Sequence, residues 1–295
     1  VAEYFQRQLN KDKDLPATIA WIKTLLWVLE ATQFETVHIL HSTIQAAVKT
    51  MRNAGVSVTA VVSGSELFLR FITLGKFDDK TVEECKEIML DRGDMFLKRL
   101  LESRNIIARH AVQFITDGCK VLTHSSSRNV FEALIFASKT NKTFEVFVTQ
   151  GGPGTSGSKM VEDLRAADVE CTLILDSAIG YIMESVDMVM VGAEAVVESG
   201  GIINRIGSFT MALCAQEMKK PFYVLAESFK FTRLFPLNQR DLPKDYKYPH
   251  CCKEEQSKIH PEADYTPPAY ITLLFTDLGI LTPSAISDEL IKLYL

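Results

Sequence analysis

The sequence predicts an α/β protein of two domains: a helical N-terminal domain over residues 1–117, then an α/β domain with a doubly wound parallel sheet over residues 118–295. Up to residue 117, apolar residues recur three and four positions apart, which is the spacing of an amphipathic helix. From residue 118, short β-rich runs alternate with segments of helical length. That alternation indicates parallel strands joined by crossover helices.

The N-terminal domain is interpreted as a group of amphipathic helices. Ile19, Ile22 and Leu26 mark the inner face of one of them. The charges in DDKTVEECKEIMLDRGDMFLKRL are expected on the outer face of a long helix. The strand-like run at 56–62 is interpreted as a short extended turn that leads into the helix containing LFLRFI.

Five strands are expected in the α/β domain, at Lys120–Thr123, Phe144–Thr149, Cys171–Leu175, Met188–Val191 and Phe222–Leu225. Helices are expected between them, at Val130–Ser138, Met160–Ala167 and Met211–Lys219. A C-terminal strand and helix within Ile271–Leu295 should pack back on the sheet. Right-handed crossovers make such a sheet doubly wound, and its ligands bind beyond the carboxyl ends of the strands.

Composition excludes several classes of protein. The net charge is −5, and residues 1–117 carry 15 basic and 15 acidic side chains, so neither half offers the positive surface that nucleic-acid binding needs. No apolar run approaches the ~20 residues that span a bilayer, and VAEYFQRQLNKDKD lacks the order of a signal peptide. We therefore expect a cytoplasmic (cytosolic) protein with no direct nucleic-acid or membrane partner. The first residue is not methionine, so the natural chain is expected to begin earlier.

The six cysteines form no CxxC pair and no paired Cys/His spacing. Cys251 and Cys252 lie near His250 and His260, but zinc fingers bring their ligands in pairs separated by two to four residues. We expect neither a disulfide framework nor a metal site.

The segment Gly152-Pro153-Gly154-Thr155-Ser156-Gly157 has the form G-x-G-x-x-G, with Asp176 closing the next expected strand. This layout is typical of dinucleotide binding, and NAD is one hypothesis. The motif nevertheless follows the second β-run of the domain, and glycines are common wherever a strand turns sharply into a helix. Both interpretations stay open from local sequence.

Other polar residues are expected at the same edge of the sheet. Thr123-His124-Ser125-Ser126-Ser127-Arg128 precedes a helix, so its backbone N–H groups could bind a phosphate, or Ser125 or Ser126 could simply cap the helix. The segment 200–207, which holds Asn204 and Arg205, is interpreted as a glycine-rich loop. His124, Asp176 and Glu194 could converge there as acid and base.

Five segments carry a resemblance to a known family: ELFLRFITL, THSSSR, LDSAIGYIMESVDMVMVGAEAVVESGGIINRIGS, KPFYVLAESFKFTRLFPLNQ and ITLLFTDLGILTPSAISDELIKLYL. Together they resemble the alpha-type subunits of translation initiation factor 2B along the length of the chain. That family is related to methylthioribose-1-phosphate and ribose-1,5-bisphosphate isomerases. The resemblance implies a helical N-terminal domain and a Rossmann-like C-terminal domain.

The resemblance also implies where the isomerases' chemistry would lie. Ser125 stands where those enzymes have a cysteine, and Glu194 stands where they have an aspartate. Asn204 matches a substrate-contacting asparagine, Arg205 replaces a lysine, and His41 replaces an arginine of a phosphate-holding segment. A serine hydroxyl is a far weaker acid than a thiol, so no catalytic residue is expected. The implied pocket, for a sugar phosphate and no other cofactor, comprises Ser125, Arg128, Glu194, Asn204 and Arg205.

The partners implied by the resemblance are a second copy of this chain, the other initiation factor 2B subunits and the phosphorylated alpha subunit of initiation factor 2. A homodimer of the α/β domain would join two four-subunit assemblies into a decamer. A different subunit would perform guanine nucleotide exchange, and this chain would regulate it in the integrated stress response. The alternative is an active aldose–ketose isomerase acting on a sugar phosphate.

Overall fold

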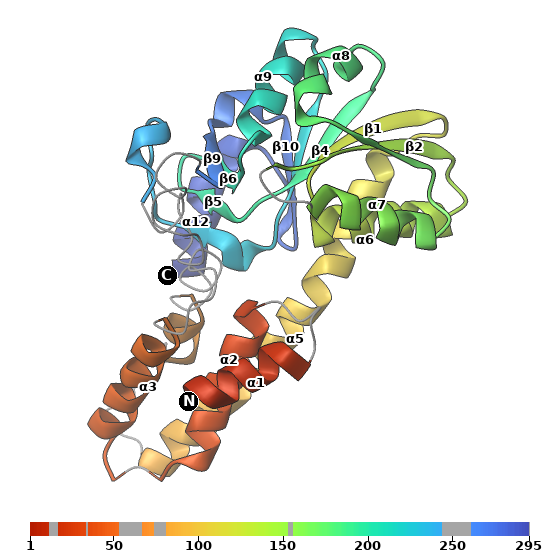
Figure 1. Cartoon of the computed structure of the whole chain (residues 1–295). Coiled ribbons are helices and arrows are strands. Elements are labelled where there is room, and N and C mark those ends of the chain that lie inside the picture. Colours follow the sequence, from red (N-terminus) through yellow and green to blue (C-terminus); the bar gives the residue numbers. More distant parts are fainter. Residues whose placement is uncertain are drawn as a thin grey trace. The chain divides into compact units, whose positions relative to one another are not determined.

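The computed structural model describes residues 1–11, 17–33, 35–52, 67–73, 81–152, 156–243 and 261–294 (Figure 1). Its contacts divide the chain into two compact units, Val1–Glu102 and Ser103–Leu293. The division falls inside one long helix, α5 (Val82–Ala111). Ile107, Ala108 and Ala111, at the end of this helix, belong to the core of the second unit. The 56–62 segment lies outside the described residues.

The first unit is helical. Its helices are α1 (Ala2–Lys11), α2 (Ala17–Ala31), α3 (Val37–Arg52), a helical segment at 67–73 and the first part of α5 (Val82–Ala111). Trp21 is fully buried and meets Phe68 edge-on at 6.2 Å between ring centroids. The helix α5 begins with a capping box, in which Glu84 accepts the N–H of Thr81 and the Thr81 hydroxyl accepts that of Glu84.

The second unit is built on a seven-stranded sheet in the order β11-β10-β7-β4-β1-β2-β3. The strands are β1 (Cys119–His124), β2 (Phe144–Thr149), β3 (Cys171–Ile174), β4 (Met188–Gly192), β7 (Phe222–Leu225), β10 (Leu273–Thr276) and β11 (Gly279–Leu281). All neighbouring pairs are parallel except β10 and β11. The predicted fold class is confirmed, with an antiparallel edge strand that the sequence did not predict.

Helices cover both faces of this sheet (Figure 1). They are α6 (Arg128–Lys139), α7 (Ser156–Ala166), α8 (Ile179–Met183) and α9 (Ser208–Glu217). A further helix, α12 (Ile286–Tyr294), follows β11. Helices α6 and α7 share one core cluster with the end of α5, and α8 packs with α9 on the opposite face. Short 3₁₀ turns in the described residues are η1 (Val112–Phe114), η2 (Asp176–Ala178), η3 (Ser228–Lys230), η4 (Gln239–Asp241), η5 (Pro268–Tyr270) and η6 (Pro283–Ala285).

A second, four-stranded sheet has the order β8-β5-β6-β9. Its strands are β5 (Ala195–Val197), β6 (Ile202–Arg205), β8 (Phe231–Thr232) and β9 (Ala263–Thr266). The interpretation of segment 200–207 as a loop is therefore wrong for its central residues. They form a strand because β6 pairs antiparallel with β5 on one side and β9 on the other.

The chain changes its direction of winding at β1, which pairs with β2 on one side and β4 on the other. In open α/β sheets the ligand site lies at such a switch point, beyond the carboxyl ends of the strands. The residues that follow β1 and β4 here are Ser125 and Ala193. None of the described helices is both long and apolar enough to cross a bilayer.

Candidate functional site

The serine-rich turn after β1 places Ser125 at the switch point. Ser125 is 1% exposed and has a φ of 58°, an uncommon backbone conformation for a non-glycine residue. Its Oγ lies 2.5 Å from the Oγ of Ser156, the first residue of α7, and its N–H donates to Thr149 Oγ1 at 3.2 Å. The close approach of Gly151 leaves no room for a side chain there, because an added Cβ would lie 2.6 Å from Ser125 Oγ.

The start of α6 is capped by Ser127, whose hydroxyl accepts the N–H of Val130 at 3.4 Å. This corrects the capping alternative, which assigned that role to Ser125 or Ser126. Arg128 is exposed on the first turn of the helix. The N-terminus of α6, with its partial positive charge, and the guanidinium group of Arg128 therefore both lie close to the switch point.

His124 is a buried structural residue. Its Nε2 lies 2.8 Å from the carbonyl of Ile206, so Nε2 carries the proton and donates, and Nδ1 accepts from the Thr149 hydroxyl at 2.6 Å. Burial lowers the pKa of the imidazole, which keeps it neutral. Both nitrogens are engaged, so the hypothesis of His124 as an acid or base converging with Glu194 is wrong.

Asp176 is also engaged by the backbone. Its two carboxylate oxygens accept the N–H groups of Gly151 at 2.9 Å and Gly152 at 2.8 Å, which fixes the start of the glycine-rich segment. The third glycine, Gly157, lets α7 lie against β2, since an added Cβ would lie 2.0 Å from the carbonyl of Thr149. The motif thus has a structural explanation in its described residues, and Asp176 is not placed as a ribose ligand.

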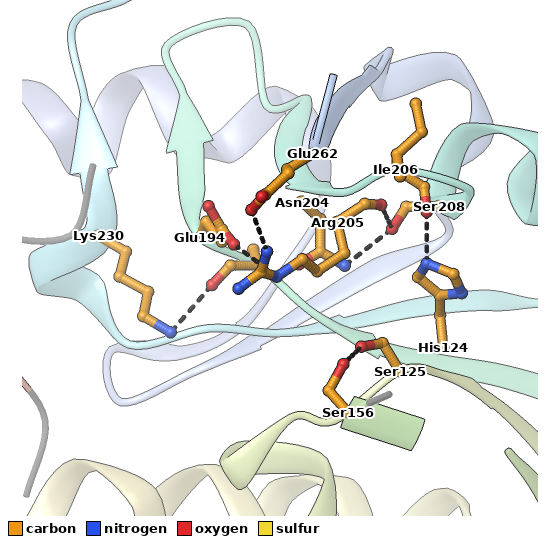
Figure 2. Close-up of polar contacts among 11 residues, drawn as sticks. His124, Ser125, Ser156, Glu194, Asn204, Arg205, Ile206, Ser208, Lys230 and Glu262 are labelled. Atoms are coloured by element: carbon orange, nitrogen blue, oxygen red, sulfur yellow. Dashed lines mark hydrogen bonds and ion pairs between the residues drawn. The ribbon is translucent and has the colours of Figure 1, made fainter. Parts of the chain in front are cut away.

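A charged cluster lies on the second sheet, where Glu194, Arg205 and Glu262 point toward one another (Figure 2). Arg205 Nε is 3.2 Å from Glu194, and Arg205 Nη1 is 2.9 Å from Glu262. Burial raises the pKa of the Glu194 carboxyl, and the charges of Arg205 and Lys230 oppose that rise. Glu194 and Arg205 keep 27% and 50% of their side-chain surface exposed, so a ligand can reach both.

Asn204 lies beside this cluster on β6 and is buried. Its amide nitrogen donates to Ser208 Oγ at 2.9 Å, and Ser208 Oγ donates to the carbonyl of Arg205 at 2.7 Å. The side chain is therefore oriented by the first residue of α9. An oriented amide can recognise a hydroxyl or carbonyl group of a ligand.

The sequence analysis did not identify Lys230 as a site residue. Lys230, in η3 after β7, donates to the carbonyl of Ala193 at 2.9 Å (Figure 2). It also pairs with Glu227 at 2.8 Å. Ser156 and Glu262 were missed as site residues as well. Ser156 and Glu262 reach the site because of where α7 and β9 lie in the fold. No local sequence pattern specifies those positions.

Of the predicted site residues, the structure brings Glu194, Asn204 and Arg205 together on the second sheet and places Ser125 and Arg128 at the start of α6. The side chain of His41 lies outside the described residues, as do Cys251 and Cys252. Hydroxyls, an amide, cations and a carboxylate are groups that can recognise a phosphorylated polyol. This arrangement has no thiol at position 125.

Comparisons with known proteins agree with this architecture. The sequence profile of the Initiation factor 2 subunit family matches residues 12–283. The chain is 40% identical over 313 aligned positions to "Translation initiation factor eIF2B subunit alpha" of Dictyostelium discoideum, covering 100% of this chain and 96% of that protein. It is 31% identical to a ribose 1,5-bisphosphate isomerase of Archaeoglobus fulgidus, over 70% of this chain and 68% of that protein.

Among solved structures, the chain resembles a subunit in "Crystal structure of the tetrameric eIF2B-beta2-delta2 complex from C. thermophilum", with a TM-score of 0.80 and 21% identity. The alignment covers 100% of this chain and 96% of that one. A helical unit followed by a doubly wound sheet thus defines the initiation factor 2B class of fold. The chain belongs to the Initiation factor 2 subunit family.

Proposed function

We propose that the chain is a regulatory, non-catalytic subunit of the guanine nucleotide exchange factor for translation initiation factor 2, acting in the cytosol. The observation that carries this proposal is similarity along the whole chain to proteins named eIF2B subunit alpha. Similarity to the ribose 1,5-bisphosphate isomerase is lower and covers about two thirds of each chain.

The chemistry at position 125 also favours a non-catalytic role. An unassisted hydroxyl does not exchange protons near neutral pH, whereas a thiol of pKa about 8.5 does. In the described part of the chain, the hydroxyl of Ser125 is hydrogen-bonded to that of Ser156, and a second hydroxyl is not a base that could activate it. An active aldose–ketose isomerase remains the second candidate, and turnover of a pentose 1-phosphate would establish it.

The polar residues at the switch point form the proposed pocket for a sugar phosphate. Arg128 and the N-terminus of α6 would face the phosphate, while Glu194, Asn204 and Arg205 would contact sugar hydroxyls. Ser125 would lie between the two groups. The bound sugar phosphate would act as a sensor or structural ligand and would not be consumed.

Exposed apolar side chains support a homodimer of the second unit. Tyr181 is 87% exposed on α8, Leu175 is 63% exposed just before it, and Leu213 is 40% exposed on α9. The two helices lie together, since a Cβ at Gly180 would be 4.0 Å from Cys214 Sγ. Apolar surface of this kind is typical of an interface, and a second copy would cover it.

In the whole factor, this dimer would join two four-subunit assemblies into a decamer. The resemblance to a subunit of the tetrameric eIF2B-beta2-delta2 complex is consistent with partner subunits of the same fold. The helical unit would contribute to sensing the phosphorylated alpha subunit of initiation factor 2, so that stress phosphorylation inhibits nucleotide exchange. A phosphoserine brings roughly −1.5 to −2 charges to that contact.

Analytical ultracentrifugation tests the assembly role. The chain alone should sediment as a dimer, and adding it to the remaining subunits should convert tetramers into decamers. A dimer that leaves the tetramers unchanged would contradict the regulatory proposal and make the isomerase the leading candidate.

A further inference from the structure

One turn carries two residues of the proposed pocket. Buried titratable side chains from other strands form hydrogen bonds to its backbone. Here the 204–209 turn denotes the end of β6, which includes Asn204 and Arg205, the linking residues Ile206 and Gly207, and the first two residues of α9. It contains Gly207, whose φ of 105° is strained for residues other than glycine. A Cβ at Gly207 would lie 2.8 Å from His124 Cε1, so the imidazole rests directly against the turn.

Asp264 holds one side of the 204–209 turn. It lies on β9 opposite Asn204, and its Oδ2 accepts the N–H of Gly207 at 2.7 Å and that of Phe209 at 3.1 Å. The side chain is only 5% exposed, and its Oδ1 has no hydrogen-bond partner in the described part of the chain. A buried oxygen without a hydrogen-bond partner is unfavourable. The two backbone hydrogen bonds of Oδ2 explain why a carboxyl group is nevertheless present at this position.

His124 holds the other side of the turn. Its Nε2–H donates to the Ile206 carbonyl at 2.8 Å, while Nδ1 is fixed by Thr149 at the end of β2. The imidazole therefore links the turn to the strand end that also binds the backbone N–H of Ser125. The two halves of the proposed pocket are connected through this ring.

Packing behind the turn is incomplete. A pocket of about 390 Å³ lies there, lined in part by Ile206, Phe209 and Asp264. Fewer atoms therefore pack against the turn on this side. The Ile206 N–H also donates to the Glu262 carbonyl at 2.8 Å. Directional hydrogen bonds must supply much of the constraint.

We infer that Asp264 and His124 are positioning residues, which hold the 204–209 turn so that Asn204 and Arg205 meet a phosphorylated ligand, and that this hold weakens when Asp264 is protonated. The ligand part of this inference rests on the proposed pocket. Neither residue touches the ligand. Both act through backbone atoms of Ile206, Gly207 and Phe209.

The ionisation of Asp264 makes the hold pH-dependent. Burial raises the pKa of Asp264 to about 7, against the opposing effect of the Phe209 and Gly207 N–H groups. The charged groups nearby are Arg205 on β6, Glu262 before β9 and Arg240, which lines the same pocket. Facing His124 are Asp176 and Arg205, and burial keeps the imidazole neutral. As pH falls through about 7, the carboxylate becomes a weaker acceptor and the turn loosens.

Hydrogen exchange tests the positioning role without any ligand. In the full chain, Asp264→Ala should speed amide exchange of Gly207 and Phe209 about tenfold, the effect of losing hydrogen bonds to a charged group. The matched control is Asp187→Asn, since Asp187 accepts the N–H of Lys120 at 2.8 Å before β1. His124→Ala should also loosen the turn, whereas His124→Gln keeps a donor for Ile206. Unchanged exchange in Asp264→Ala and His124→Ala would overturn the inference.

Calorimetry with ribose 5-phosphate and glucose 6-phosphate tests the link to binding. Wild-type affinity should fall between about pH 8 and about pH 6, and the nearly isosteric Asp264→Asn should show a smaller fall, due to the ligand's own phosphate. Asp187→Asn should behave as wild type. Equal pH profiles for wild type and Asp264→Asn would overturn the link. If wild type binds neither compound, the ligand proposal fails, and the exchange result alone decides whether the turn is held as described.

Discussion

Glu227 is a carboxylate buried at the end of β7, with 3% of its side-chain surface exposed. Its oxygens contact Lys230 at 2.8 Å, Asn129 at 2.8 Å and Arg104 at 3.5 Å. Burial alone would raise the pKa of Glu227, but the Lys230 charge and hydrogen bond, with help from Asn129 and Arg104, lower it to about 2. The ionised form is therefore strongly preferred in the folded protein.

This pKa shift gives a residue-scale prediction. Relative to the usual value of 4.5, the shift contributes on the order of 3 kcal/mol of stability above about pH 4.5, which is lost as pH falls toward 2. Glu227→Gln should lower the free energy of unfolding by about that amount at pH 7 and by much less near pH 3. Urea unfolding at both pH values measures the difference.

The control for Glu227 is a surface ion pair in the same unit. Glu145 lies 3.5 Å from Lys120, and both side chains are partly exposed. Glu145→Gln should cost less than about 1 kcal/mol at either pH. A loss for Glu227→Gln no larger than this would show that the buried network does not stabilise the fold.

Gly157 decides how closely a helix approaches the sheet. Because an added Cβ would meet the backbone carbonyl of Thr149 at 2.0 Å, Gly157→Ala must shift α7 away from β2. We expect a loss of about 1–3 kcal/mol in unfolding free energy. Thermal or urea unfolding measures it.

Gly180 is the matched control for this element-scale prediction. It lies in α8, where the nearest atom to an added Cβ is Cys214 Sγ at 4.0 Å. Gly180→Ala should be neutral or slightly stabilising, since alanine favours a helix by up to about 1 kcal/mol over glycine. Similar losses for both variants would contradict the close-contact explanation.

The strands of the main sheet were predictable because their β-rich runs are separated by helices. β2 and β7 match the expected residues, Phe144–Thr149 and Phe222–Leu225, at both ends. The second sheet was not predictable. Its strands have two to four residues, and β6 finds its partner β9 far along the chain, as in the pairing of Asn204 with Asp264. Long-range pairing of this kind overrides local preference.

The same contrast holds at the site. Ser125 and Glu194 were identifiable because they follow expected strands and because of the family resemblance. Lys230 and Ser156 were not, since what gives them a role is the carbonyl of Ala193 and the hydroxyl of Ser125, respectively. His124 was assigned the wrong role because its sequence neighbourhood does not reveal Ile206 and Thr149 as partners of its two nitrogens.

At the scale of the molecule, the apolar surface at Tyr181 predicts where two copies meet. Tyr181→Asp places a charge in that surface, whose burial is costly, and should convert the proposed dimer into a monomer. Sedimentation of the purified chain measures the mass. Leu237→Asp is the control, because Leu237 is 75% exposed on the separate loop after β8. Dissociation by the control alone would place the interface elsewhere.

The helical unit should carry the response to the phosphorylated partner. Lys49 is exposed on α3, in the helical unit that we propose contributes to sensing the phosphorylated partner. Reversing its charge with Lys49→Glu should weaken inhibition of nucleotide exchange by phosphorylated initiation factor 2 and leave sedimentation of the assembly unchanged. Lys98→Glu on α5 is the control in the same unit. Equal loss of inhibition and assembly in Lys49→Glu would contradict this role.

The pairing of strands in the four-stranded sheet determines when this sheet can form during synthesis of the chain on the ribosome. β5 and β6 are synthesised before β9, so the edge of β6 that carries Asn204 and Arg205 has no partner until β9 has been made. The proposed pocket is therefore completed only after β9 has been synthesised, when most of the strands of the larger sheet have already emerged. A nascent chain stalled before β9 would have many of the strands of the larger sheet but an incomplete form of the proposed pocket.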